Sequence, residues 1–168
     1  MASDDASTRL TIRQPTGQFV GAFNFEVIVN WDESIFSPSD DTTITQSFTR
    51  VSGVVSHSEQ MEFMQGTDPF VRKAPGRAAF EDVTLERVYN GVDAFYAWRA
   101  YVQQGNDAPL SVDIYMKRRD GTDARHVQCV GAWPSRWEMP EMDAGGSSAA
   151  VERITLTVLE VLEIKVDA

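Results

Sequence analysis

One stretch of the sequence, residues 90–105, has the pattern of an amphipathic helix, and it constrains the fold because the rest of the chain alternates as strands do. Three apolar residues share one face of such a helix, at spacings of i, i+3 and i+7: Phe95, Trp98 and Val102. Asn90 or Asp93 can cap the first turn, and Gly105 suits the left-handed position after the last turn. The pattern predicts a helix over about residues 92–104. Because a helix of this length is not stable alone in water, its apolar face must cover a sheet.

Segments with alternating apolar and polar residues lie on both sides of that helix. Residues 23–30 and 110–117 alternate most regularly. The Asp-Gly pair at 120–121 is a turn signal, so residues 110–117 should form a hairpin with the strand that follows. We also expect strands over residues 80–89 and 150–164, the second as one long strand. About seven strands predict a mainly β fold, an antiparallel β-barrel or sandwich of two packed sheets with one flanking α-helix.

A longer strand-like segment, residues 47–66, carries a glycine and several polar residues in its middle. Gly53 indicates a bulge or a close approach of two backbones. Because His57 and Glu59 interrupt the apolar alternation, we expect this strand to leave its own sheet and to continue beyond the body of the domain. Residues 67–77 contain Asp-Pro and Pro-Gly pairs, which are typical of a loop.

Prolines and polar residues divide the rest of the chain. Pro134 and Pro140 should confine the segment around them to an edge or a bend. Four large residues gather there and serve either the core or an interface: Trp133, Trp137, Met139 and Met142. The composition of residues 31–46 predicts a surface loop, and residues 1–14 form a polar N-terminal arm.

The size and charge of the chain narrow the classes of protein to consider. A length of 168 residues predicts a single domain over residues 1–168. The formal net charge of −10 opposes general electrostatic binding to nucleic acid, although it does not exclude a local basic patch. No apolar run has the length of a membrane span and the first residues contain no signal core, so we expect neither membrane anchoring nor a secretory signal.

No set of residues points to catalysis, to a cofactor or to a metal. The two histidines, His57 and His126, have no nucleophile motif and no second metal ligand at a useful spacing. The single cysteine, Cys129, excludes an intrachain disulfide, and its neighbours favour a small core residue over a nucleophile. We therefore expect a protein that is not an enzyme and that needs no cofactor.

Several motifs, each weak alone, follow one another in a specific order. They are Phe48-x-x-Val51-Ser52-Gly53-Val54, Glu62-Phe63-x-x-Gly66, Pro75-Gly76, Val83-Thr84-Leu85-Glu86-Arg87, Phe95-x-x-Trp98, the Asp120-Gly121 hairpin, Ala132-Trp133-Pro134-Ser135-Arg136-Trp137 and Val151-Glu152-Arg153-Ile154-Thr155-Leu156. In this order, over residues 23–164, the sequence resembles the inner tube proteins of contractile phage tails and contractile injection systems. The ring protein of type VI secretion is related to that family.

The resemblance implies a structural role. Six copies would form a ring, and stacked rings would form a hollow tube inside a contractile sheath. The implied partners are further copies of the chain, the sheath, baseplate, spike and cap proteins, and cargo or DNA in the lumen. Assembly in the cytoplasm would produce part of a phage tail or a phage tail-like particle. The acidic surplus either keeps phosphate from adhering to the lumen wall or only keeps the monomer soluble.

The implied contacts between copies lie on the long strand and on the loop after it. A ring closes when one surface meets a different surface of the next copy, and that requires exposed strand edges. The expected ring and stacking residues are Phe48, Val51, Gly53, Val55, Met61, Phe63, Phe70, Arg72, Lys73 and Arg77. Phe95, Trp98 and Val102 are the expected core residues of the helix.

The sequence departs from the family pattern at several places, which leaves alternatives open. Ala74 stands where the family usually has leucine before Pro-Gly, and the last strand lacks the usual His-Glu-Gly. The chain is then either the repeating tube subunit or a ring where the tube meets the baseplate. Two other classes are a small ligand-binding β-barrel, which needs a continuous apolar interior, and an enzyme with an unfamiliar site.

Overall fold

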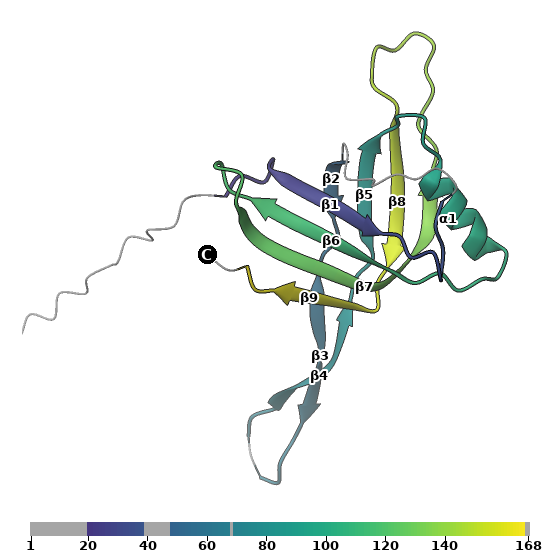
Figure 1. Ribbon diagram of the computed structural model, residues 1–168. Coiled ribbons are helices and arrows are strands. Elements are labelled where there is room, and N and C mark those ends of the chain that lie inside the picture. Colours follow the sequence, from purple (N-terminus) through teal and green to yellow (C-terminus); the bar gives the residue numbers. More distant parts are fainter. Residues whose placement is uncertain (1–19, 39–47, 68, 167–168) are drawn as a thin grey trace, which may run out of the picture.

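The computed structural model describes residues 20–38, 48–67 and 69–166, and these form nine strands and one helix (Figure 1). The elements in chain order are β1 (Phe25–Asn30), β2 (Phe48–Ser52), β3 (Ser56–Phe63), β4 (Arg72–Phe80), β5 (Val83–Val88), α1 (Ala94–Gln103), β6 (Leu110–Lys117), β7 (Asp123–Glu138), β8 (Val151–Thr157) and β9 (Glu160–Ile164). Every strand pairing is antiparallel. The mainly β fold with one flanking helix is confirmed.

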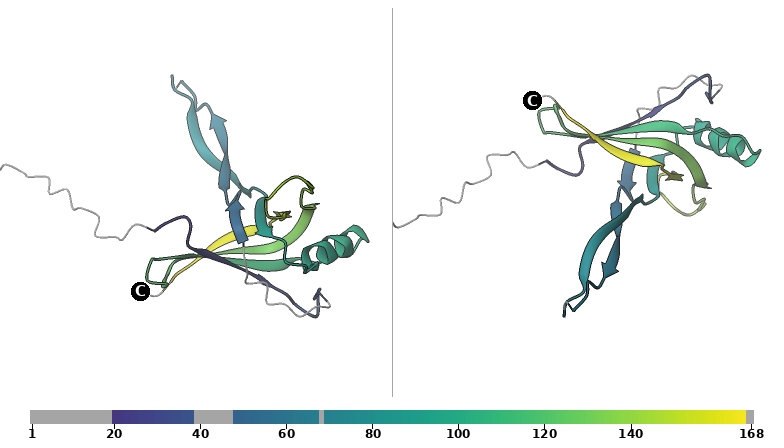
Figure 2. Two further views of the ribbon diagram at one scale, coloured as in Figure 1. Left: turned by 90° about the horizontal axis from the view of Figure 1, so that it is seen from above. Right: turned by 90° about the horizontal axis from the view of Figure 1, so that it is seen from below.

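The longest strand, β7, joins two layers of one sheet. Its first part pairs with β6 along one edge and with β9 along the other, while its last part pairs with β8. The strand order is β1-β6-β7-β8-β5-β2, and β9 lies beside β7. Gly131 lies between the two parts of β7 with φ of +65°, and a Cβ atom there would be only 2.9 Å from Cβ of Leu159. A larger residue would not fit, so glycine permits the curvature with which β7 passes between the layers (Figure 2).

The hydrophobic core fills the space between the two layers. Val27 and Val112 come from the β1–β6 layer, Leu85 and Ile154 from the β5–β8 layer, and each is buried. The two layers pack as a sandwich, and the described strands do not close into a barrel. An apolar interior of this kind supplies the main free energy of folding.

Helix α1 covers one end of the sandwich (Figure 1). It spans ten residues within the expected range, and Gly105 adopts the left-handed conformation with φ of +88°. Asp93 precedes the first turn, but its side chain makes no capping hydrogen bond. Arg99 donates a hydrogen bond of 3.3 Å to the carbonyl of Pro134, so the helix also covers the part of β7 that lies beyond its pairing with β6.

The prediction of a loop over residues 67–77 was wrong in its second half. Strand β4 starts at Arg72 and pairs with β3 through Pro75 and Gly76. A two-stranded ribbon tolerates proline because half of its backbone N–H groups point away from the partner strand. The register also shifts between Ser58 and Gln60, opposite Pro75, which marks a bulge.

Pro134 lies inside β7, in the part of the strand that pairs with β8 alone, so the predicted edge or bend is confirmed. It coincides with a register shift between Pro134 and Arg136, and it follows Ala132, where the pairing with β6 ends. The missing N–H of the proline therefore falls where the strand changes partners, which is the bend that proline favours.

Two expected strands are each divided. Residues 150–164 form β8 and β9, because the chain turns after Thr157 and β9 joins the other layer. Residues 80–89 end β4 and form β5. Strand β1 begins at Phe25, which leaves Phe23 exposed outside it. The polar arm at residues 1–14 and the second half of the predicted loop, residues 39–46, lie outside the described residues.

Candidate assembly interface

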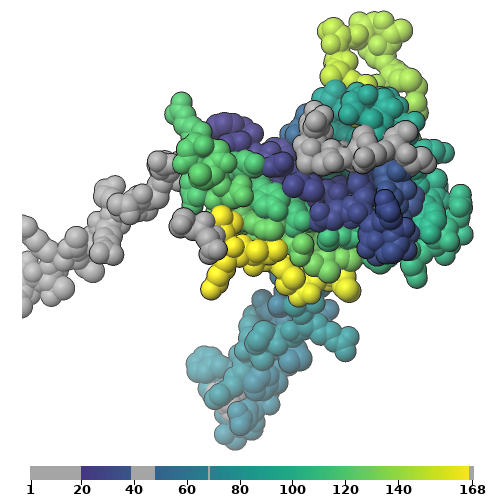
Figure 3. Space-filling model, in the orientation of Figure 1, coloured from purple at the N-terminus to yellow at the C-terminus, as the bar shows by residue number. Residues whose placement is uncertain are grey.

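Strands β3 and β4 form a hairpin that projects away from the sandwich (Figures 1 and 3). All eight residues of β3 are exposed, in contrast to β5, where every second residue is buried. A two-stranded hairpin with no hydrophobic face against a core is only marginally stable in water. The expected departure of this segment from its own sheet is therefore present, and the rest of the described chain does not cover the two faces of the hairpin.

Gly53 connects the hairpin to the sandwich. Its φ is +85°, and a Cβ atom would lie 2.1 Å from the backbone oxygen of Asp82. The Glu81 amide also donates a 3.1 Å hydrogen bond to the Val55 carbonyl. The two chain segments at the base of the hairpin therefore cross in close contact, and a side chain at position 53 would push them apart.

The hairpin carries large apolar side chains in water. Their exposed fractions are 56% for Met61, 48% for Phe63, 71% for Met64, 75% for Phe70 and 51% for Val71. Single exposed apolar residues are common on protein surfaces, but a group of five on one projecting element is typical of an interaction site.

Both signs of charge are present on the hairpin. Strand β4 carries Arg72, Lys73 and Arg77, and β3 carries Glu59 and Glu62. Lys73 Nζ lies 3.5 Å from a carboxylate oxygen of Glu62, and both side chains are more than half exposed. An ion pair this exposed contributes little to stability, so its charges can be exchanged for others in a contact.

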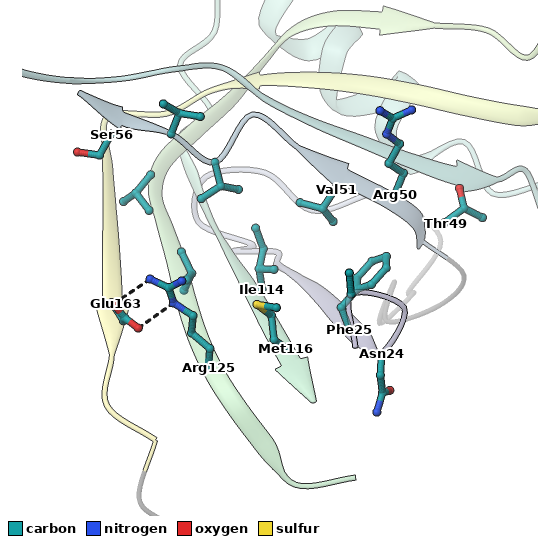
Figure 4. Close-up of a pocket in the computed structure, with 15 residues that line it drawn as sticks. Asn24, Phe25, Thr49, Arg50, Val51, Ser56, Ile114, Met116, Arg125 and Glu163 are labelled. Carbon is teal, nitrogen blue, oxygen red and sulfur yellow. Dashed lines mark hydrogen bonds and ion pairs between the residues drawn. The ribbon is translucent and has the colours of Figure 1, made fainter. Parts of the chain in front are cut away.

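An open cleft of about 650 Å³ lies between the layers next to the base of the hairpin (Figure 4). Phe25, Ile114 and Met116 face Val51 across it, and Val55 lies at the point where the chain enters the hairpin. At the rim, Arg125 makes a bidentate ion pair with Glu163 of β9 at 2.8 and 3.1 Å. The cleft is a largely apolar surface that the described residues leave open.

The residues expected to contact other copies are therefore distributed between three environments. Phe48 and Val51 pack against the core, and the Phe48 ring lies 5.9 Å from that of Phe95. Gly53 and Val55 lie at the base of the hairpin. The remaining ones project on its strands and tip: Met61, Phe63, Phe70, Arg72, Lys73 and Arg77. Of the helix residues, Phe95 and Trp98 are 1% and 0% exposed, and Val102 is half-buried against the core.

Two exposed apolar residues of the hairpin were missed by sequence reasoning, Met64 and Val71. Both lie in the segment treated as the end of a strand and a loop, where apolar residues carry no periodic signal. The pair formed by Arg87 and Glu152 was also missed, although a signal was available. Each lies two residues from buried apolar neighbours on the inward side of its strand, and such alternation predicts an inward side chain.

The outer face of the β1–β6 layer carries a polar cluster around Asp113. His126 Nε2 and Gln128 Nε2 lie 2.8 and 3.1 Å from Oδ1 of Asp113, and Asn30 donates to Oδ2 at 2.6 Å. The ring of Tyr115 stacks on His126 at 4.1 Å. These side chains satisfy one another, and among the described residues no group of three His, Cys, Asp or Glu side chains converges on a metal site.

Cys129 is buried at 1% exposure, and burial, followed by the nearby charge of Asp113, raises the pKa of its thiol to about 11. The reactive thiolate is therefore about a hundredfold scarcer than for a thiol of ordinary pKa. We expect Ellman's reagent at pH 8 to label Cys129 at least about a hundredfold more slowly in the folded chain than in urea. Equal labelling rates in the two states would show that the thiol is accessible.

Within the part of the chain that the structure describes, no helix is both long and apolar enough to cross a membrane.

Comparison with known proteins gives one family and several structures. The family model described as T4-like virus tail tube protein gp19 matches residues 21–161. No curated protein matches the sequence.

Three solved structures have a similar fold. A chain of the sheath-tube complex of an extracellular contractile injection system, PVC, in its extended state has 23% identity and a TM-score of 0.74, with 90% of this chain and 95% of that chain covered. A chain of the anti-feeding prophage cap, the AFP tube terminating cap, has 23% identity and a TM-score of 0.75, with coverages of 94% and 99%. A type six secretion system protein has 14% identity and a TM-score of 0.53, with coverages of 82% and 81%.

Proposed function

The chain belongs to the family of T4-like virus tail tube proteins, and on this premise we propose that it forms hexameric rings that stack into the hollow inner tube of a contractile phage tail or injection system. The observation that carries the proposal is the β3–β4 hairpin, with every residue of β3 exposed and five large apolar side chains in water. Within one copy the hairpin buries few apolar side chains and so adds little stability, whereas a neighbouring copy can cover these side chains. The proposed role is structural and not enzymatic.

Ring closure requires that one surface of a copy meets a different surface of the next. The sandwich offers two elements for such a contact, the hairpin and the apolar cleft beside its base. In the proposed ring, the strand β3 side of one hairpin lies against the neighbouring copy, and Met61 and Phe63 become buried there. Among the described strands, β1 and β2 end the sheet order, and their outer edges are further places where backbone groups can pair between copies.

The proposed partners beyond the ring follow from the machines in which similar folds occur. Similar chains come from a sheath-tube complex and from a tube-terminating cap. We extend this to sheath, cap, baseplate and spike proteins around the tube, with cargo or DNA in the lumen and assembly in the cytoplasm. The alternative is that the chain forms a ring where the tube meets the baseplate. The two roles differ in self-assembly, because such a ring would not stack on itself into long tubes.

Replacing Met61 with aspartate is expected to abolish ring formation while the monomer stays folded. Met61 lies in the middle of β3 and is 56% exposed, so the change costs the monomer no more than about 0.5 kcal/mol. In an interface, the same carboxylate would be buried without a partner. Size-exclusion chromatography with light scattering measures the mass of the assembly, and thermal melting checks the fold.

Met142→Asp is the matched control, because Met142 is 77% exposed on the loop between β7 and β8, far from β3. This control should still give rings. Rings of normal mass from the Met61→Asp variant would contradict the proposed ring contact, and a wild-type chain that stays monomeric at high concentration would contradict the proposed function.

A further inference from the structure

The loop between β5 and α1 contains the only Asn-Gly pair of the sequence, Asn90-Gly91. Asparagine before glycine is open to spontaneous loss of ammonia, because the backbone nitrogen of the second residue can attack the side-chain carbonyl carbon and glycine puts no side chain in its path. Both residues are exposed. Gly91 has φ of +88°, and a Cβ atom built there would meet no described atom within 4 Å. The cyclic intermediate of this reaction therefore has room to form in the folded chain.

A hydrogen bond prepares the Asn90 side chain for this attack. The Val92 amide donates to Oδ1 of Asn90 at 3.2 Å, which folds the side chain back over the Gly91 backbone. Negative charge develops on Oδ1 when the nitrogen attacks, and an amide donor at that oxygen stabilises it. Within the described chain, the Gly91 amide itself donates no hydrogen bond, so the attacking nitrogen is not held by another group.

The two ends of this loop are fixed to the rest of the molecule. The Tyr89 amide donates to the Ala150 carbonyl at 2.8 Å, and Nη2 of Arg87 donates to the Val92 carbonyl at 2.5 Å. Arg87 is buried, so the second contact is sheltered from water. The folded chain therefore holds Asn90 between two anchored residues, in the arrangement that favours attack.

The leaving nitrogen distinguishes Asn90 from the other three asparagines of the sequence. Among the described residues, the side-chain amide nitrogen of Asn90 has no hydrogen-bond acceptor. In each of the others this nitrogen donates within the chain: Asn24 to the Arg118 carbonyl at 2.7 Å, Asn30 to Asp113 and Ser111 at 2.6 and 3.0 Å, and Asn106 to the Tyr101 carbonyl at 3.1 Å. A residue with a side chain also follows each of these three. The fold thus restrains their amide groups and leaves that of Asn90 free.

The Asp120-Gly121 turn has the same shape but lacks the reactive groups. Gly121 has φ of +87°, and the Thr122 amide donates to Oδ1 of Asp120 at 3.0 Å. The Gly121 amide, however, donates to the Arg118 carbonyl at 3.0 Å, so this nitrogen is held. Hydrogen bonds from the Thr122 hydroxyl and amide lower the pKa of Asp120, so its side chain is a charged carboxylate at neutral pH. A carboxylate resists attack, and Asp120 therefore serves as an internal comparison.

We propose that Asn90 is a site of self-modification, at which the chain converts asparagine to isoaspartate and aspartate through a succinimide. The Gly91 nitrogen gives its proton to solvent base and forms a bond to Cγ of Asn90. The bond from Cγ to Nδ2 then breaks, and the amide group leaves as ammonia. A water molecule opens the ring at one of its two carbonyl carbons, which gives aspartate or isoaspartate, and no further reactant is needed.

The two products differ in what they do to the start of α1. Aspartate keeps the oxygen that accepts from the Val92 amide, so the loop can remain as it is. Isoaspartate passes the main chain through Cγ and adds a methylene to it between Arg87 and α1, which are joined by the contact of Arg87 with Val92. The modification would therefore distinguish old chains from new ones at the helix that covers the core, and it does not depend on the proposed tube function.

Incubation of the purified protein at pH 8 tests the proposal, with peptide mapping by mass spectrometry and labelling of isoaspartate by a carboxyl methyltransferase. Asn90 should deamidate at least about tenfold faster than any other asparagine of the folded chain. Asn90→Gln should remove the isoaspartate label. The same chain in guanidinium is the reference. On folding, the rate at Asn90 should stay within about threefold of the reference or rise above it, because the donor at Oδ1 is kept.

A pair of variants tests the part played by the Val92 amide. Val92→Pro removes this N–H, and Val92→Ala keeps it, while both leave Asn90-Gly91 unchanged. Each rate is divided by the rate of the same variant in guanidinium, which removes the effect of local sequence. The divided rate of Val92→Pro should be at least about threefold lower than that of Val92→Ala. Circular dichroism checks that both variants fold.

Two results would overturn the proposal. One is a wild-type rate at Asn90 that falls more than about threefold on folding, since the fold would then protect the residue. This measurement needs no variant, so it decides even if Val92→Pro does not fold. The other is an equal divided rate for the two folded Val92 variants, because the Val92 amide would then play no part in the reaction.

Discussion

Replacement of Trp98 with alanine is expected to lower the free energy of unfolding by about 3–5 kcal/mol. Trp98 lies on the face of α1 that meets the sandwich, and its side chain is fully buried. The Trp31 ring lies edge-on to it, with the ring centroids 5.5 Å apart. Its Nε1 donates a 3.0 Å hydrogen bond to the Ala108 carbonyl. Alanine would leave a cavity between the helix and the sandwich and an unpaired buried carbonyl, and both effects lower stability.

Urea unfolding followed by far-ultraviolet circular dichroism measures this loss. It should be repeated at two protein concentrations, because assembly makes the transition midpoint depend on concentration. Tyr96→Ala is the control on the same helix, since Tyr96 is 51% exposed. If the two variants lose the same stability, α1 does not cover the core. Trp98→Phe keeps an aromatic ring and loses the N–H donor, so its stability should lie between those of wild type and Trp98→Ala.

The position of α1 could be predicted from sequence because its signal is local. Phe95 and Trp98 follow the helical spacing, and Gly105 ends the pattern, so neighbours in the sequence define the element. Strand β6 is similar, since its apolar alternation and the turn at 120–121 lie within a few residues of each other. The resemblance to tail tube proteins, which the family match confirms, rested on the order of such local signals along the chain.

Strand β4 could not be predicted in the same way. Its pairing with β3 buries almost nothing in its own chain, so no apolar alternation marks it, and Pro75-Gly76 gives the local signal of a loop. The physical reason for a strand there is backbone pairing with β3, whose residues lie from 9 (Phe63 with Arg72) to 24 (Ser56 with Phe80) positions away, so the residues within β4 do not carry the signal. The same absence of burial is what exposes the hairpin to a partner.

The turn between β8 and β9 depends on a residue from another part of the chain. Apolar residues stay in phase through Val158, so the sequence predicts one strand. The chain turns there because Leu159 passes close to Gly131 of β7, where a Cβ would lie 2.9 Å from the Leu159 side chain. The Leu159 amide donates to the Val130 carbonyl at 3.0 Å. Only the fold brings these positions together.

The sequence predicted where the candidate interface lies, but it did not predict which of its residues pack against the core of their own chain. The polar positions in residues 47–66 indicated a segment that leaves the sandwich, and the hairpin does so. Phe48 and Val51, by contrast, pack against the core of their own chain, since β2 pairs with β5 before the chain leaves at Gly53. Their part in contacts between copies stays a prediction. Whether a given apolar residue faces the core of its own chain depends on which strands pair. The alternation of apolar and polar residues in the sequence does not give the strand pairing.

Removing either member of the buried Arg87–Glu152 pair is expected to cost about 3–5 kcal/mol of unfolding free energy. Both side chains are 1% exposed, and Arg87 Nε lies 2.6 Å from Glu152 Oε2. Arg87 also donates to the Val92 carbonyl at 2.5 Å and lies 4.5 Å above the Phe95 ring, so it connects β5 to the start of α1. Arg87→Met leaves a carboxylate buried without its cation, and Glu152→Leu leaves the guanidinium without its anion.

A double-mutant cycle separates the pair from the helix contacts. In Arg87→Met/Glu152→Leu no buried charge remains, so the loss should be well below the sum of the two single losses, with a coupling of about 2 kcal/mol or more. The double variant still loses stability, because Val92 O and Trp137 Nε1, which donates to Glu152 at 2.7 Å, are left without these partners. Urea unfolding of all four proteins gives the coupling. Additive losses would mean that the two side chains act separately and that the ion pair does not hold α1 to the sheet.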